Sequence, residues 1–212
     1  MRTALDWAFS SSGEAAVGVA LTFAAVPLWF ASSQTRECSV RVNAALAAAP
    51  LNRDDAKQMG LRAALAWSLM QTRGSVAETR HPWESVLQIA ERLDDADYRL
   101  RAIWGLWAGL LNSSDLTAAL RFAHNFADPA AKARPADRPV GDRMIGYILR
   151  LMGDQSRARV HIERMLENYQ EPIVVAEIIR FVFDQRGVSR CFLARIVWLQ
   201  RFADQAVQLP TT

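Results

Sequence analysis

A small residue followed at i+4 and i+8 by larger apolar residues recurs along this chain of 212 residues. The four full copies are Cys38, Val42, Leu46; Ser85, Ile89, Leu93; Ala118, Phe122, Phe126; and Ala158, Ile162, Leu166, and a fifth copy begins at Ala206. Positions i, i+4 and i+8 lie on one face of an α-helix. Each copy therefore predicts a helix whose small residue lets the preceding helix come close. Units of this kind bury their apolar faces by stacking on their neighbours.

Turn signals divide the chain at regular places, and strand signals are nearly absent. The turns are SSSG at 10–13, SSQ at 32–34, APLNRDD at 49–55, TRGS at 72–75, NSS at 112–114, residues 128–142, GD at 153–154 and QEP at 170–172. This pattern predicts an all-α fold: a right-handed array of nine or ten helices with one continuous core. We expect one domain over residues 1–212, with hairpins at about 3–48, 56–94, 96–127, 140–169 and 173–209.

Prolines predict two irregular places in this array. The segment from Asp128 to Asp142 holds three prolines and is predicted to be a mobile loop that could cap a groove. Pro27 predicts a kink or an early break in the helix that contains it.

No charged residue lies between Glu14 and Arg36. The strictly apolar part, Ala15 to Ala31, is 17 residues of mainly alanine, glycine and valine, whereas a membrane helix needs about 20 mostly apolar residues. Asp6 and Glu14 stand where a signal peptide would be basic. We therefore predict a helix buried on most faces, without membrane association. Its outer face is expected to be covered by a missing upstream domain or by a second copy, which makes a homodimer possible.

The charge balance argues against direct contact with nucleic acid. The net charge is +3, and basic and acidic residues are interleaved along the whole chain, as on solvated helix faces. Only two of the 25 basic residues are lysine, which with the many alanines suggests a bacterial, GC-rich gene. Cys38 and Cys191 are far apart and predict two free, buried thiols in a reducing cytoplasm.

The chemistry of common enzymes is not found in the sequence. Neither lysine follows a glycine as in a phosphate-binding loop, and no GxSxG motif occurs. His81, His124 and His161 have no other ligand residue at metal spacing. We therefore predict a protein that is not an enzyme and that has no catalytic residues, metal or cofactor.

Two resemblances add to this interpretation. A small residue five positions after a turn, as in GDQSRA at 153–158, resembles a degenerate tetratricopeptide repeat. The strings ALDWAF at 4–9, VPLWF at 26–30, WGLW at 104–107, VGDRMIG at 140–146, MGDQSRARVHIERML at 152–166 and FDQR…LARIVWLQ at 183–200 look like the helical region of bacterial predicted-ATPase, winged-helix transcriptional regulators.

The second resemblance implies a signal-sensing or protein-interaction module that binds an effector or partner. It also implies ATPase and DNA-binding domains upstream, and ALDWAF so soon after Met1 favours a fragment. The alternative is a structural scaffold or oligomerisation module without a small ligand.

The repeat resemblance also implies a concave groove and candidate contacts within it. Counting from the turns at Ser113 and Gly153 gives Trp107 and Tyr147 the same groove-lining position. The same face adds Arg143, Arg150, Arg195 and Trp198. Aromatic rings with arginines could bind a protein or peptide partner or a small anionic effector; ordinary core packing with solvated arginines is the alternative. For FDQRGVSR at 183–190, we favour a helix-end charge network over a recognition edge.

Overall fold

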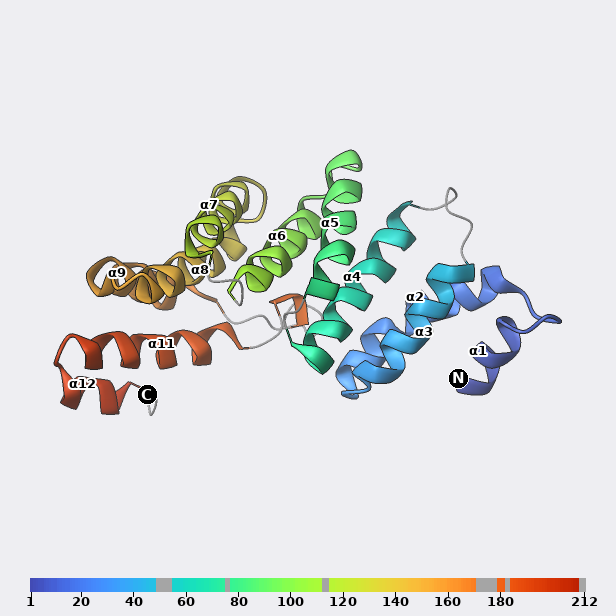
Figure 1. Ribbon diagram of the computed structural model, residues 1–212, viewed down its shortest axis with the longest axis horizontal. Coiled ribbons are helices and arrows are strands. Elements are labelled where there is room, and N and C mark those ends of the chain that lie inside the picture. Colours follow the sequence, from blue (N-terminus) through green and yellow to red (C-terminus); the bar gives the residue numbers. More distant parts are fainter. Residues whose placement is uncertain (49–54, 75–76, 112–114, 171–178, 182–183, 210–212) are drawn as a thin grey trace. The chain divides into compact units, whose positions relative to one another are not determined.

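The computed structural model describes residues 1–48, 55–74, 77–111, 115–170, 179–181 and 184–209. Within these residues it contains eleven α-helices, two 3₁₀ helices and no strand (Figure 1). The α-helices are α1 (Arg2–Ala8), α2 (Ala15–Ala31), α3 (Thr35–Ala48), α4 (Asp55–Arg73), α5 (Ala77–Arg92), α6 (Ala96–Leu110), α7 (Leu116–Ala133), α8 (Arg138–Leu151), α9 (Gln155–Asn168), α11 (Gln185–Leu199) and α12 (Ala203–Gln208), and the 3₁₀ helices are η1 (Pro135–Asp137) and η2 (Ile179–Phe181). The all-α prediction is confirmed, with slightly more helices than expected.

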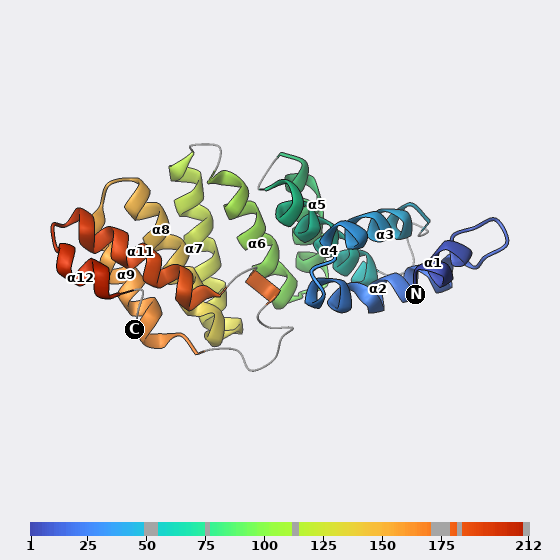
Figure 2. The same ribbon diagram turned by 90° about the horizontal axis from the view of Figure 1, so that it is seen from below.

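The chain divides into two compact units, Met1–Gly109 and Leu110–Thr212. In the first unit α2 packs on α3, α3 on α4 and α4 on α5. In the second unit α8 packs on α7 and α9, and α11 packs on α9 and α12 (Figure 2). The pairs α2–α3, α4–α5 and α8–α9 are consecutive helices that pack on one another.

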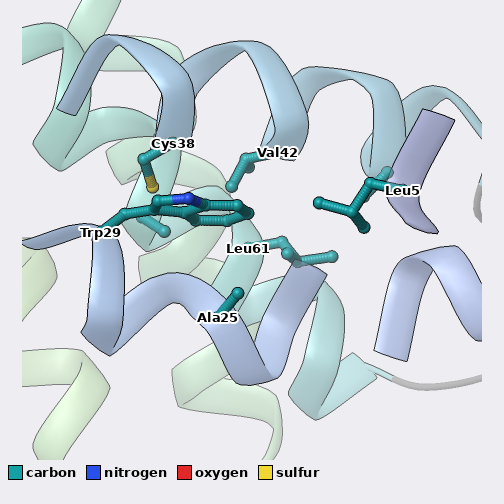
Figure 3. Close-up of a cluster of buried hydrophobic side chains, with 8 residues drawn as sticks. Leu5, Ala25, Trp29, Cys38, Val42 and Leu61 are labelled. Atoms are coloured by element: carbon teal, nitrogen blue, oxygen red, sulfur yellow. The ribbon is translucent and has the colours of Figure 1, made fainter. Parts of the chain in front are cut away.

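The N-terminal core of the first unit forms around the ring of Trp29, which is 1% exposed. Cys38 and Val42 of α3 point toward this ring from one side, and Leu61 of α4 lies beside it (Figure 3). The first repeat copy therefore buries its small residue and its i+4 residue against α2, as predicted. Leu5 closes the same cluster from α1.

Tryptophans continue this core through the first unit. Trp67 stacks on Trp104 with ring centroids 5.7 Å apart and meets Trp83 edge-on at 6.3 Å. Trp107 lies 6.2 Å from Trp104. Six of the seven tryptophans precede Gly109, and only Trp198 lies in the second unit.

Helices α8 and α9 come close at Gly146. A Cβ atom at this position would lie 2.7 Å from Cδ1 of Ile162 and 3.1 Å from the carbonyl oxygen of Ala158. Only hydrogen fits there, so the fourth repeat copy packs as predicted. Gly153, with φ of +89°, makes the turn between the two helices, and Asp154 caps α9 by accepting a hydrogen bond from the Arg157 backbone N–H at 3.0 Å.

The prediction of a mobile loop from Asp128 to Asp142 is wrong. Residues 128–142 are helical except for Arg134. Pro135 begins η1 and Pro139 lies in the first turn of α8, where a missing N–H costs no helical hydrogen bond. Pro129 lies inside α7. Likewise α2 continues through Pro27 to Ala31, so the early break is not found.

The second repeat copy is also placed incorrectly. Leu93 is 43% exposed and Ser85 is only half-buried, whereas Trp83, Val86 and Ala90 carry the buried face of α5. The buried thiol was predicted correctly for Cys38, but Cys191 is exposed.

A candidate binding surface on helices α8 and α11

The six predicted groove residues divide into three environments. Trp107 and Arg143 are interior, at 2% and 1% exposure. Tyr147 and Arg150 are half-buried, and Arg195 and Trp198 are exposed. The interior positions differ from the prediction because a side chain without exposure cannot line an accessible groove.

The position of Trp107 has a simple cause. Four residues separate Leu110, the end of α6, from the N-cap Asp115 of α7, whereas two separate Leu151 from the N-cap Asp154. Counting residues back from the turn therefore reaches a different position on α6 than the same count reaches on α8. Aligned on the helix ends instead, Trp107 corresponds to Ile148, which is fully buried.

The ring of Tyr147 on α8 contacts the ring of Phe192 on α11, with centroids 4.5 Å apart. The Arg150 guanidinium lies over both rings, 5.1 Å from the centroid of Tyr147 and 5.7 Å from that of Phe192. Arg195 follows Phe192 by three positions and lies about 60° from it around α11. We call Tyr147, Arg150, Phe192 and Arg195 the Tyr147 surface.

Trp198 does not join this surface. It follows Phe192 by six positions, which places it about 120° away around α11, and it is 63% exposed. The sequence prediction missed Phe192, although its position three residues before Arg195 on a helical face was the available signal.

Arg143, four residues before Tyr147 on α8, is a buried cation. Burial lowers the pKa of Arg143 to about 10, and the charge interactions with Tyr147 and Tyr169 oppose this decrease. The guanidinium therefore remains protonated at neutral pH.

The neighbouring Asp142 faces α9. Its carboxylate accepts a hydrogen bond from Nε of Arg164 at 3.0 Å and lies 2.9 Å from Nδ1 of His161. Burial favours a higher pKa for Asp142, but the hydrogen bonds from His161 and Arg164 and the charge of Arg164 outweigh it, so the pKa lies below its usual value. This pairing fixes α8 against α9 and gives Asp142 a partner other than Arg143.

A buried ion pair holds η2 at the start of α8. Nη1 and Nη2 of Arg180 donate to the two carboxylate oxygens of Asp137 at 2.9 and 2.8 Å, and Arg134 donates to the same carboxylate at 3.1 Å. Phe181 packs edge-on against Phe126 of α7 at 5.6 Å. The sequence contained no signal for this pair, because Asp137 fell in the supposed loop.

The FDQRGVSR segment agrees with the helix-end interpretation where it is described. Asp184 caps α11 by accepting hydrogen bonds from the backbone N–H groups of Arg186 and Gly187 at 2.9 and 3.0 Å. Arg186 donates to the carbonyl oxygen of Tyr169 at 3.1 Å. These bonds fix α11 relative to the end of α9, and they thereby position Phe192 beside Tyr147.

The net positive charge of the chain comes from the second unit. Residues 1–109 contain 11 basic and 11 acidic residues, and residues 110–212 contain 14 basic and 11 acidic residues. The Tyr147 surface is therefore part of the only unit with an excess of positive charge.

Two cavities are lined by described residues of the second unit, and none of the six predicted residues lines either. One, of about 300 Å³, lies between α9, α11 and α12; the other, of about 390 Å³, is lined by residues of α7. The described residues contain no group of three metal-ligating side chains. No described helix combines the length and apolarity needed to cross a bilayer.

No protein-family model and no curated protein sequence matches the chain. Solved structures do. BtubC (BKLC) from P. vanneervenii superposes with a TM-score of 0.68 at 13% identity, covering 98% of this chain and 83% of that one. The TPR-like repeats of a putative kinesin light chain from Podosopora anserina give 0.64 at 16% identity, covering 90% of both chains.

A third structure comes from a different setting. It is a STAND protein (signal transduction ATPase with numerous domains) from Pyrococcus horikoshii that has a tetratricopeptide repeat sensor. It superposes with a TM-score of 0.59 at 16% identity. The match covers 89% of this chain and 28% of that protein. At these identities the comparisons establish the fold: the chain is an all-α array of tetratricopeptide-like helical repeats.

Proposed function

We propose that the chain is a protein-interaction module whose Tyr147 surface binds an acidic segment of a partner protein. The observation that carries the proposal is Arg150. Its guanidinium lies over the rings of Tyr147 and Phe192, and it has no carboxylate partner among the described residues.

The position of Arg150 over two aromatic rings, and not its lack of an ion pair, distinguishes it from other arginines of the second unit. Arg159 pairs with Glu163 at 2.7 Å, and Arg180 pairs with Asp137 at 2.8 Å. Within the described part of the chain, Arg150 and Arg195 have no such pair, and the same holds for several other arginines of this unit. Arginine and aromatic side chains dominate the energy of many protein interfaces, and an arginine held over a ring presents its hydrogen-bond donors in a fixed direction.

The side chains of the surface suit a protein segment with both acidic and apolar residues. The two cavities lined by described residues of the second unit do not include the Tyr147 surface, and small ligands usually occupy concave pockets. An extended segment can instead place carboxylates on Arg150 and Arg195 and an apolar side chain on Phe192.

The test uses a fluorescein-labelled peptide of alternating glutamate and leucine residues and measures its anisotropy against the full chain. Because each 1.4 kcal/mol of lost interaction is about tenfold in affinity, we expect Arg150→Ala and Arg195→Ala each to weaken binding by about three- to tenfold. Arg157→Ala is the matched control, since Arg157 is an exposed arginine of α9 whose partner is Asp154. Absence of peptide binding, or equal effects of all three substitutions, would refute the proposal.

We further propose that the module is the sensor part of a bacterial cytoplasmic, ATP-dependent transcriptional regulator, with ATPase and DNA-binding domains upstream. Support comes from the resemblance of strings such as VGDRMIG at 140–146 to that family and from the STAND structure with its repeat sensor. Reading the gene upstream of Met1 tests this step. A phosphate-binding loop encoded in the same reading frame is expected, and a stop codon directly upstream would contradict it.

A further inference from the structure

A cavity of about 300 Å³ lies in the second unit where α11 packs on both α9 and α12. Small-molecule sites begin at about this size, roughly 300 Å³. Since a water molecule takes up about 30 Å³ of the liquid, the cavity has room for about ten non-hydrogen atoms. This is the size of a single amino acid.

Three aliphatic side chains line the cavity. Leu193 and Val197 of α11 are 5% and 1% exposed, and the half-buried Leu209 follows the end of α12. Among the described residues that line the cavity, none is aromatic. This lining suits a branched aliphatic group, which removes its methyl groups from water there.

An ion pair of α9 also lines the cavity. Nε of Arg159 donates to Oε1 of Glu163 at 2.7 Å, and the two residues are the only charged ones among the described lining residues. Nη1 of Arg159 donates to Oε1 of Gln200 at 3.4 Å, and the guanidinium lies 5.9 Å from the ring centroid of Phe202. These contacts fix Arg159 in place.

Each member of this ion pair keeps an unused polar atom. Nη2 of Arg159 and Oε2 of Glu163 have no hydrogen-bond partner within the described part of the chain. A positively charged donor and a negatively charged acceptor are therefore available side by side, next to an aliphatic lining.

We propose that this cavity binds a free α-amino acid with a branched aliphatic side chain, such as leucine. Its carboxylate accepts a hydrogen bond from Arg159, its ammonium donates to Glu163, and its side chain packs on Leu193 and Val197. An α-amino acid carries both charges on one carbon atom, so it matches two opposite charges that lie in contact. A ligand with a carboxylate alone would be repelled by Glu163, and one with an ammonium alone would be repelled by Arg159.

The ligand would also stabilise α12. Ala206 is the only buried residue of this helix, whereas Gln205 and Leu209 line the cavity opposite the residues of α9 and α11. A bound amino acid adds contacts that exist only while α12 is in place. Amide hydrogen exchange in residues 203–208 is therefore expected to slow at least about threefold in the presence of the ligand.

Titration calorimetry of the full chain with L-leucine tests the proposal, at ligand concentrations that detect a dissociation constant of up to about 1 mM. Two analogues each lack one charge: 4-methylpentanoate has no ammonium, and 3-methylbutylamine has no carboxylate. Each is expected to bind at least about tenfold more weakly than L-leucine, because it leaves one member of the ion pair without its partner. Glycine, which lacks the side chain, is expected to bind more weakly as well.

Variants locate the site. Glu163→Gln keeps the contacts of Arg159 with Gln200 and Phe202, so its circular dichroism melt should be unchanged, yet it is expected to bind L-leucine about tenfold more weakly. The matched control is Glu84→Gln on α5, which removes the carboxylate of another i,i+4 pair, with Arg80. This control is expected to bind L-leucine like the unaltered chain.

Three results would overturn the inference. A chain that gives no binding heat with L-leucine has no such site. Equal affinities for L-leucine and 4-methylpentanoate would show that the ion pair does not recognise the ligand. Unchanged affinity in Glu163→Gln, or an equal loss in Glu84→Gln, would show that L-leucine binds somewhere other than this cavity.

Discussion

The buried pair between Asp137 and Arg180 allows a quantitative test of how the second unit is held together. Their side chains are 8% and 2% exposed, so water screens the pair little. Arg180→Ala removes two hydrogen bonds, of 2.9 and 2.8 Å, and leaves the carboxylate buried. Removing one member of a buried pair costs about 3–5 kcal/mol. Because Arg134 still donates to Asp137 at 3.1 Å, we expect the lower end, about 3 kcal/mol.

The double variant distinguishes the pair from simple loss of packing. Asp137→Ala leaves the Arg180 guanidinium without its carboxylate and is expected to cost at least as much as Arg180→Ala. The variant D137A/R180A removes both charges, so it should cost less than the sum of the two single substitutions, with a coupling of about 2 kcal/mol.

Hydrogen exchange of peptides from α8, measured in increasing urea, reports the stability of the second unit. The transition for Arg180→Ala is expected at a lower urea concentration with an unchanged slope. A loss below about 1 kcal/mol, within the range of an exposed ion pair, or costs that simply add in the double variant, would show that the pair does not fix η2.

Three further predictions concern single positions. Gly146→Val should destabilise the second unit by about 2 kcal/mol in urea unfolding, because a Cβ there meets Ile162 at 2.7 Å. The folded pKa of Asp142 is below its unfolded value, so its stabilisation is present above about pH 4 and is lost as the pH falls through the folded pKa. The stability difference between the unaltered chain and Asp142→Asn should therefore shrink as the pH falls below about 4, and a constant difference would contradict this. Burial raises the pKa of Cys38, whereas Cys191 is exposed, so Ellman's reagent should titrate one thiol rapidly in the native chain and none in Cys191→Ser.

Helical periodicity predicted the parts of the fold that depend on local packing. Ala158 and Ile162 are fully buried between α8 and α9, as their spacing required, because a small residue and an aliphatic residue on one face determine how closely two helices approach. The same rule failed at Ser85, because the true buried face of α5 includes Trp83. Two helices can pack closely at a small residue, or they can pack further apart around a tryptophan. The spacing of apolar residues alone does not distinguish these two kinds of interface.

The candidate surface was predicted less well, since it depends on contacts between distant helices. Tyr147 and Arg150 were found because both belong to one helix, α8. Phe192 was missed because its contact with Tyr147 joins residues 45 positions apart, and no local pattern records that distance. The loop predicted at residues 128–142 was wrong for a physical reason. Pro135 and Pro139 lie in the first turns of helices, where the missing N–H of proline is not needed. In a sequence, prolines at helix starts cannot be told from prolines in loops.

The uneven distribution of tryptophans makes the chain its own optical probe. Six indoles lie before Gly109, and Trp29, Trp83, Trp104 and Trp107 among them are at most 2% exposed. Their emission should shift to longer wavelengths when the first unit unfolds. Trp198 is already 63% exposed, so its emission should change little when the second unit does. Intrinsic fluorescence therefore follows one half of the molecule while circular dichroism follows both, and any gap between the two curves measures how independently the halves melt.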